Sequence, residues 1–392
     1  MISRYLGIEE WVALGVLFGL FVAQMYWYGR YLAATARKIR RDKKSKAAEP
    51  EAENPLPGVT VIVCAHNERE NLSAYLQALL MQDYPEYEVI VVDDGSEDDT
   101  RRILEDYAAY HPHLHITFVP CGARVGSTKK LALTLAAKSA QYEYLLLTDA
   151  DCVPESNQWI REMMKGFQSP ITNHQSPIDI VLGFSPYFEE PGSINRLVRY
   201  DTLFNGLHYL GAALCGHPYM GVGRNLAYRK SLFFNSGGFT HLMTNKAGDD
   251  DLFVNLLATK QNTAVVVHPN AYIWSLPKRT LKAWWQQKRR HLSVSPAYRS
   301  STKFRLTLEP LTRGLFYAAV IGIGIVYQLS LVTLIALGLF LIRWIVQTIL
   351  INVSARRMGL KRFAMGSILW FDIILPLINL WMIIIPKRQA KW

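Results

Sequence analysis

Two aspartates stand two residues apart at the end of a short apolar run. Asp149 and Asp151 follow residues 144–148, a run that is typical of a buried strand. Because side chains alternate along a strand, we expect both carboxylates to leave it on the same side. Carboxylate oxygens suit Mg²⁺ or Mn²⁺, and Mg²⁺ in particular usually keeps substrate phosphates among its ligands. The pair therefore predicts a divalent cation held against a diphosphate.

The elements that would position these carboxylates alternate between strands and helices. We expect strands at 59–64, 88–92, 115–119 and 144–148, separated by helices at 68–81, 96–110 and 127–139. This alternation predicts an α/β fold with a mostly parallel sheet and helices on both faces. Ligands of such sheets bind beyond the carboxyl ends of the strands, where Asp93, Asp94, Asp149 and Asp151 all fall.

The sequence after residue 170 is less regular. We expect strands at 179–184, 264–268 and 271–275, and helices at 194–214 and 252–258. Residues 280–291 form a basic, amphipathic segment with Trp284 and Trp285, which favours a helix at a membrane interface.

Apolar stretches at both ends of the chain predict membrane helices. Residues 11–28 carry no charge and are followed by a basic segment, so we expect an anchor with the N-terminus outside and the middle of the chain in the cytosol. Residues 315–353 read as two spans with a break at 327–330. Pro376 and Asp372 interrupt the last stretch, 365–385, so its topology stays open between a full span and a broken or re-entrant helix.

Composition argues against several other functions. The net charge of +11 collects at the membrane flanks, where it meets anionic lipid, so nucleic acid is not an expected partner. The four cysteines form no Cys-x-x-Cys pair and indicate no zinc site. Ionisable residues are nearly absent from the apolar stretches, apart from Arg343 and Asp372, which argues against a transporter.

Seven short motifs occur in an order that resembles one enzyme family. They lie at 66–68, 89–100, 126–133, 149–151, 221–229, 248–251 and 285–291. With them, residues 57–296 resemble the family 2 glycosyltransferases, inverting enzymes of GT-A fold that use nucleotide-diphosphate sugars. The similarity is greatest to the membrane-embedded branch with cellulose, hyaluronan and poly-N-acetylglucosamine synthases.

The resemblance implies which residues bind the nucleotide. Glu68 and Asp94 would hold the nucleoside with support from Asp93, although His66 stands where the family usually has tyrosine. A carboxylate can accept hydrogen bonds from a base or from ribose hydroxyls.

The resemblance also implies how the diphosphate and the metal are bound. Lys129 aligns with the lysine that meets the diphosphate, and Lys130 stays an alternative. Asp151 would bind Mg²⁺ or Mn²⁺ directly, and Asp149 would contact the ribose or the metal.

Three consecutive aspartates contain the implied general base. Asp250 aligns with the carboxylate that takes a proton from the acceptor hydroxyl, with Asp249 beside it, and the register among 249, 250 and 251 stays open. Because like charges crowd this segment, we expect a raised pKa for Asp250.

Two further motifs imply contacts to the sugars. Gly223, Asn225 and Arg229 match a strand near the donor sugar and the acceptor. Gln287 and Arg290 match a Gln-x-x-Arg-Trp motif whose arginine meets the diphosphate, a better fit than the register with Gln286 and Arg289. His291 then replaces the tryptophan, which leaves acceptor stacking and processivity open.

The expected organisation has five parts. They are an anchor at 1–31, a basic segment and linker at 32–57, a GT-A domain at 58–276, amphipathic interface helices at 277–313, and two to three membrane helices at 314–392. We expect the protein to transfer a sugar from a nucleotide-diphosphate sugar, with a UDP-sugar as the first candidate. The acceptor would be a saccharide or a lipid-linked compound at the cytoplasmic face of the inner membrane. The product would be a β-glycoside in cell-surface polysaccharide synthesis, with export or assembly proteins as candidate partners. The alternative is addition of one sugar to a lipid carrier or glycolipid.

Overall fold

The computed structural model describes residues 7–48, 55–120, 126–168, 177–243 and 247–384. The chain divides into two compact units. A helical unit combines Met1–Ala36 with Arg299–Trp392, and a central unit spans Arg37–Tyr298. Residues 49–54 of the predicted basic segment and linker, 32–57, lie outside the described residues.

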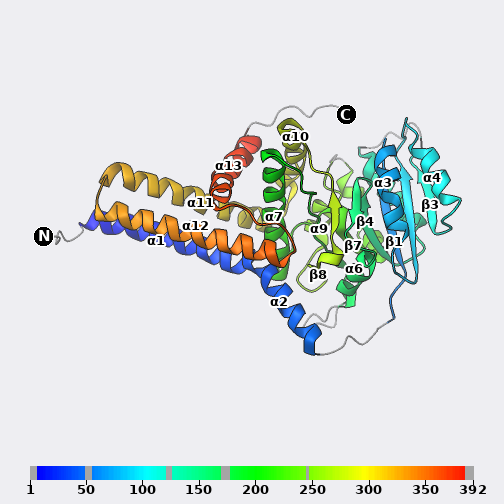
Figure 1. The fold of residues 1–392 in the computed structure, drawn as a ribbon, viewed down its shortest axis with the longest axis horizontal. Helices are drawn as coiled ribbons and strands as arrows, with labels where there is room; N and C mark the ends of the chain where they lie inside the picture. Colours follow the sequence, from blue (N-terminus) through cyan, green and yellow to red (C-terminus); the bar gives the residue numbers. More distant parts are fainter. Residues whose placement is uncertain (1–6, 49–54, 121–125, 169–176, 244–246, 385–392) are drawn as a thin grey trace. The chain divides into compact units, whose positions relative to one another are not determined.

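A seven-stranded mixed sheet forms the frame of the central unit (Figure 1). Its order is β3 (Leu114–Phe118), β2 (Tyr87–Asp93), β1 (Val59–Ala65), β4 (Tyr144–Asp149), β7 (Leu226–Arg229), β6 (Ile180–Leu182) and β8 (Thr263–Val265). The first four strands are parallel, as the sequence predicted. β7 runs antiparallel to both β4 and β6, a reversal that the sequence did not indicate.

Helices cover both faces of the parallel strands. α3 (Arg69–Leu80), α4 (Thr100–Ala108) and α6 (Trp159–Gln168) share one hydrophobic core with alternate residues of β1, including Val61 and Val63. α5 (Thr128–Ser139) packs along β1, β2 and β3 with the buried residues Ala132 and Ala136. The alternation of β1 therefore supplies apolar side chains to two layers of helices.

The second half of the central unit adds shorter elements. They are β5 (Cys152–Pro154) paired with β9 (Ile273–Ser275), the helices α7 (Ser193–Leu214), α8 (Lys230–Asn235), α9 (Asp251–Leu257) and α10 (Leu281–Leu292), and the 3₁₀ turns η2 (Gly223–Asn225), η3 (Thr240–Leu242), η4 (Pro269–Ala271) and η5 (Ser295–Ala297). A buried ion pair joins α10 to α7, with Lys288 Nζ 2.6 Å from Asp201 Oδ1. The predicted interface helix is thereby fixed to the central unit.

Four helices are long and apolar enough to cross a membrane among the residues that the structure describes. The first begins as α1 (Ile8–Trp27) and continues through a π-helical turn, η1 (Tyr28–Leu32), into α2 (Ala33–Ala48). The others are α11 (Ser300–Tyr327), α12 (Leu331–Arg357) and α13 (Met365–Ile384). The break between α11 and α12 lies where the sequence predicted it. α13 continues through Pro376, so of the two alternatives left open by the sequence the structure favours the continuous helix over the broken one.

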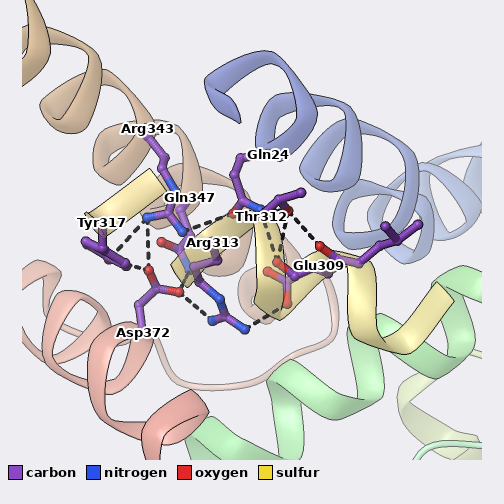
Figure 2. Close-up of polar contacts among 9 residues, drawn as sticks. Gln24, Glu309, Thr312, Arg313, Tyr317, Arg343, Gln347 and Asp372 are labelled. Carbon is purple, nitrogen blue, oxygen red and sulfur yellow. Dashed lines mark hydrogen bonds and ion pairs between the residues drawn. The ribbon is translucent and has the colours of Figure 1, made fainter. Parts of the chain in front are cut away.

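A buried polar cluster lies inside the helical unit, and Asp372 of α13 is at its centre (Figure 2). The Asp372 carboxylate accepts hydrogen bonds from Arg313 (2.8 Å), Arg343 (2.9 Å), Tyr317 (2.6 Å) and Gln347 (2.7 Å).

Glu309 and Gln24 complete the cluster. Arg313 also donates to Glu309 at 2.7 Å, and Arg343 donates to Gln24 of α1 at 3.1 Å. Arg343 and Asp372, the two ionisable residues of the predicted apolar stretches, are thus joined by a second cation and a second anion from residues before position 315. Two arginines balance two carboxylates, which is the condition under which such charges are tolerated in an apolar setting.

Candidate active site

The loops that follow β1 and β2 are joined by hydrogen bonds. The Asn67 amide donates to Ser96 Oγ at 2.9 Å, and the Glu68 amide donates to Thr100 Oγ1 at 2.9 Å. Asn67 adopts a positive φ of 56°, a conformation that asparagine tolerates better than most residues. Asp94 donates its amide to the Ala65 carbonyl at 2.8 Å. The predicted nucleoside-binding residues Glu68 and Asp94 therefore lie on two neighbouring loops.

Asp93 has a structural role in the same region. It is buried, and its Oδ1 accepts the Ser96 amide at 2.9 Å. This bond shapes the turn after β2, and the supporting role of Asp93 in nucleoside binding stays a prediction.

Glu68 faces the paired aspartates. Burial raises the pKa of Glu68, and the nearby charges of Asp151 and Asp149 raise it further, although a hydrogen bond from Asn71 opposes them. Three carboxylates from two strand ends thus act on one another at the carboxyl edge of the parallel strands.

Lys129, at the start of α5, lies between two of the acidic segments. Its Nζ is 3.0 Å from Asp149 Oδ1 and 3.4 Å from Asp249 Oδ2. Burial would raise the pKa of Asp149, but the Lys129 ammonium lowers it. Lys130 instead buries its ammonium against the carbonyl groups of Leu242 and Ala247. The structure therefore brings Lys129, rather than Lys130, to the aspartates.

Asp250 is held at the N-terminus of α9 with both carboxylate oxygens engaged. Oδ2 accepts the Gly223 amide and Oδ1 accepts the Asp251 amide, each at 2.8 Å. A side chain at Gly223 would bring its Cβ to 3.2 Å from Asp250 Oδ2, so glycine permits the close approach.

Hydrogen bonds from Gly223 and Asp251 help to lower the pKa of the Asp250 carboxyl group. Burial would raise its pKa, but the hydrogen bond from Asp251, the charge of His291 and the Gly223 amide lower it well below the usual range. The expected raised pKa of Asp250 is therefore wrong, because donors outweigh the like charges. Burial raises the pKa of both neighbours, Asp249 and Asp251, and Oδ2 of Asp251 accepts a hydrogen bond from the Tyr298 hydroxyl at 3.1 Å in the interior.

Two residues implied by the resemblance lie away from this group. Asn225 is buried, and its amide bonds Trp159, Phe184 and Ala271 within the core. Its hydrogen-bonding capacity is used in packing, so the role expected at the sugar is not supported by its position.

Arg229 lies at the opposite end of the sheet. It pairs with Tyr144 at the start of β4, whereas Asp149 ends that strand. Its guanidinium binds the Ile178 carbonyl at 3.0 Å and lies 3.4 Å from Asp179. The antiparallel direction of β7 causes this displacement and corrects the expected contact to the sugars.

Helix α10 is connected to the aspartates through Tyr187 and Arg224, two residues that the sequence did not single out. Gln287 Nε2 donates to the Tyr187 hydroxyl at 2.9 Å, and the Arg224 guanidinium lies 4.5 Å from the centre of the Tyr187 ring. The charge of Arg224 acts on Asp151 and Asp149. Arg224 could have been noticed as a cation inside the 221–229 motif, whereas Tyr187 carried no sequence signal.

His291 and Arg290 occupy the last turn of α10. Desolvation lowers the pKa of His291 to about 4, and Asp250 acts in the opposite direction, although the residue keeps an exposed surface. Arg290 is exposed, and its charge acts on His291. The predicted base Asp250, the aspartates Asp149 and Asp151, and the α10 motif therefore lie close to one another.

The acidic residues fit a cation whose coordination is completed by substrate. Among the described residues no group of three or more His, Cys, Asp or Glu side chains is arranged to hold a metal alone. Mg²⁺ is commonly bound by one or two carboxylates together with substrate phosphates. Asp151 suits that role, because it remains partly exposed and, within the described residues, its carboxylate accepts a hydrogen bond only from the weakly polar Cys152 thiol, at 3.3 Å.

Comparisons with known proteins agree on the type of domain. Residues 60–233 match the model of glycosyl transferase family 2. The poly-beta-1,6-N-acetyl-D-glucosamine synthase of Staphylococcus epidermidis is 24% identical over 241 residues, which cover 59% of this chain and 53% of that protein. Glycosyltransferase AglE of Haloferax volcanii is 31% identical over 152 residues, 38% of this chain and 46% of its own. The chain thus spans about half the length of these curated relatives.

A solved structure has a similar fold along most of the chain. The mannosyltransferase PcManGT from Pyrobaculum calidifontis, solved in complex with GDP-Man and Mn²⁺, superposes with a TM-score of 0.56 at 21% identity. The match covers 93% of this chain and 99% of that one. Residues 60–233 therefore resemble glycosyl transferase family 2 in sequence, and the fold of the chain is similar to that of a solved mannosyltransferase.

Proposed function

We propose that the protein transfers a sugar from a nucleotide-diphosphate sugar to an acceptor hydroxyl, with inversion at the anomeric carbon. The observation that carries the proposal is the convergence of Asp149, Asp151 and Asp250, from two separate chain segments, around Lys129 and Arg224. Such a group of acids and cations suits a metal-bound diphosphate next to a proton acceptor.

Asp250 is the proposed base. As the acceptor oxygen attacks, it forms a bond to the anomeric carbon and its proton passes to the Asp250 carboxylate. The bond between that carbon and the diphosphate breaks, and its electron pair leaves with the nucleoside diphosphate. The lowered pKa keeps Asp250 ionised at neutral pH, so its carboxylate carries no proton before the acceptor binds.

The remaining residues hold the donor. Glu68 and Asp94, supported by Asp93, bind the nucleoside, and Lys129 and Arg290 approach the diphosphate. Asp151, with Asp149, holds Mg²⁺ or Mn²⁺. When bound, the cation offsets negative charge on the leaving diphosphate. Gln287 orients α10 through Tyr187.

We further propose that the reaction takes place at the cytoplasmic face of the inner membrane, with a saccharide or a lipid-linked compound as acceptor. Basic residues after α1 favour a cytoplasmic central unit. Synthesis of a cell-surface polysaccharide is the first candidate, because the curated relatives include a polysaccharide synthase. Addition of one sugar to a lipid is favoured by His291, which replaces the tryptophan expected for acceptor stacking.

Turnover with a panel of donors tests this proposal. We expect the purified protein in lipid nanodiscs to release nucleoside diphosphate from one UDP- or GDP-sugar when Mg²⁺ or Mn²⁺ is present, and to lose that activity in EDTA. Including GDP-sugars is warranted because PcManGT binds GDP-Man. Product size distinguishes polymer from a singly glycosylated lipid. The absence of metal-dependent release with every donor and a lipid extract as acceptor would refute the proposal.

A further inference from the structure

Arg224 is a cation whose backbone is fixed on both sides. It is the middle residue of the η2 turn, between Gly223, whose amide binds Asp250, and Asn225, which is buried with three side-chain hydrogen bonds. The direction in which the Arg224 side chain leaves the turn is therefore determined by its neighbours.

The Arg224 side chain is also oriented at its far end. Its guanidinium packs on the Tyr187 ring at 4.5 Å, a cation–π contact, and the Tyr187 hydroxyl is itself bonded to Gln287. Nη1 is buried and has no hydrogen-bond partner within the described part of the chain. A buried donor without a partner is costly, so its retention next to the acidic group indicates that a ligand engages it.

From this arrangement we infer that Arg224 binds the diphosphate of the donor and stabilises the negative charge that appears on it as the sugar departs. This inference rests on the proposed function. Breaking the bond to the sugar leaves one more negative charge on the diphosphate than the intact donor carries. A guanidinium donates two parallel hydrogen bonds to phosphate oxygens and is pre-oriented here, so no reorganisation is needed as charge develops.

Lys129 cannot supply this charge alone. Its ammonium lies within 3.4 Å of both Asp149 and Asp249, so much of its field is offset by those carboxylates. The charge of Arg224 also acts on Asp151 and Asp149, but its guanidinium packs on an aromatic ring, which leaves N–H groups to donate to phosphate.

Binding of nucleotides to full-length variants in nanodiscs tests the inference. With Mn²⁺ present, affinities for UDP and GDP are compared with those for UMP and GMP. For Arg224→Gln we expect roughly 10–100-fold weaker binding of the preferred diphosphate and a much smaller change for its monophosphate. Arg224→Lys, which keeps the charge but not the planar fork, should fall between the two. Arg161→Gln, which breaks a surface contact to Asp83, is the matched control and should bind as the wild type does.

The possible results distinguish a failure of the role inferred for Arg224 from a failure of the proposed function. Wild-type diphosphate affinity in Arg224→Gln overturns the inference, and so does an equal loss for mono- and diphosphate, which would mark a purely structural role. If Arg224→Gln does not fold, Arg224→Lys decides by the same comparison. A wild-type protein that binds neither diphosphate overturns the proposed function and, with it, the role of Arg224.

Discussion

Replacement of Asp250 by asparagine is expected to lower the turnover number by about 10²–10⁴-fold, the usual contribution of a general base. Asparagine has nearly the same shape and is a good N-terminal cap, so α9 should remain capped. It can accept only one of the two amide hydrogen bonds that Asp250 accepts, which predicts a loss of stability of about 1 kcal/mol. Donor turnover and thermal unfolding of the purified variant measure the two effects.

The adjacent aspartate provides the matched control. Asp251 is buried against Tyr298, so Asp251→Asn should change stability while transfer remains detectable. Equal loss of activity in both variants, or retention of full activity in Asp250→Asn, would place the base at another residue. The comparison therefore distinguishes Asp250 from Asp251 in the register that the sequence left open.

Replacement of Asp372 by asparagine is expected to destabilise the helical unit by about 3–5 kcal/mol, the cost of removing one partner from a buried ionic network. The variant leaves Arg313 and Arg343 in the interior with one carboxylate, that of Glu309, in place of two. Thermal unfolding in detergent, followed by circular dichroism, should show a clear fall in the melting temperature.

Two further variants show whether charge is the cause. Leu377→Ala, at a side chain of α13 that is 61% exposed, should have little effect on melting. Adding Arg343→Gln to Asp372→Asn removes one uncompensated cation and should recover part of the loss. A melting temperature unchanged by Asp372→Asn would show that the cluster does not hold α13 to α11 and α12.

The parallel half of the fold was predictable because its signals are local. The strand from Val59 to Ala65 is apolar except for Thr60, and the next helix repeats leucines at helical spacing. Glu68, Asp94, Asp149 and Asp151 follow the ends of such strands, so their common edge followed from the parallel arrangement. The long apolar stretches likewise gave the membrane helices.

The remaining features depend on contacts between distant residues. The direction of β7 decides that Arg229 lies far from Asp149, and no local pattern specifies that direction. The pKa of Asp250 depends on an amide 27 residues away, at Gly223. The polar cluster joins residues of four helices, so Glu309 and Arg313 looked like ordinary residues of an interface segment. In each case tertiary contacts overruled the local pattern.

The position of a bound metal shows whether Asp151 and the cations beside it hold the donor. Crystals of the protein with Mn²⁺ and the preferred nucleoside diphosphate, measured at a wavelength where manganese scatters anomalously, locate the ion without reference to any assumed ligand. The account predicts one peak within coordination distance of an Asp151 oxygen, with the diphosphate bridging towards Lys129 and Arg224. A nucleotide bound with its manganese away from Asp151 would contradict it.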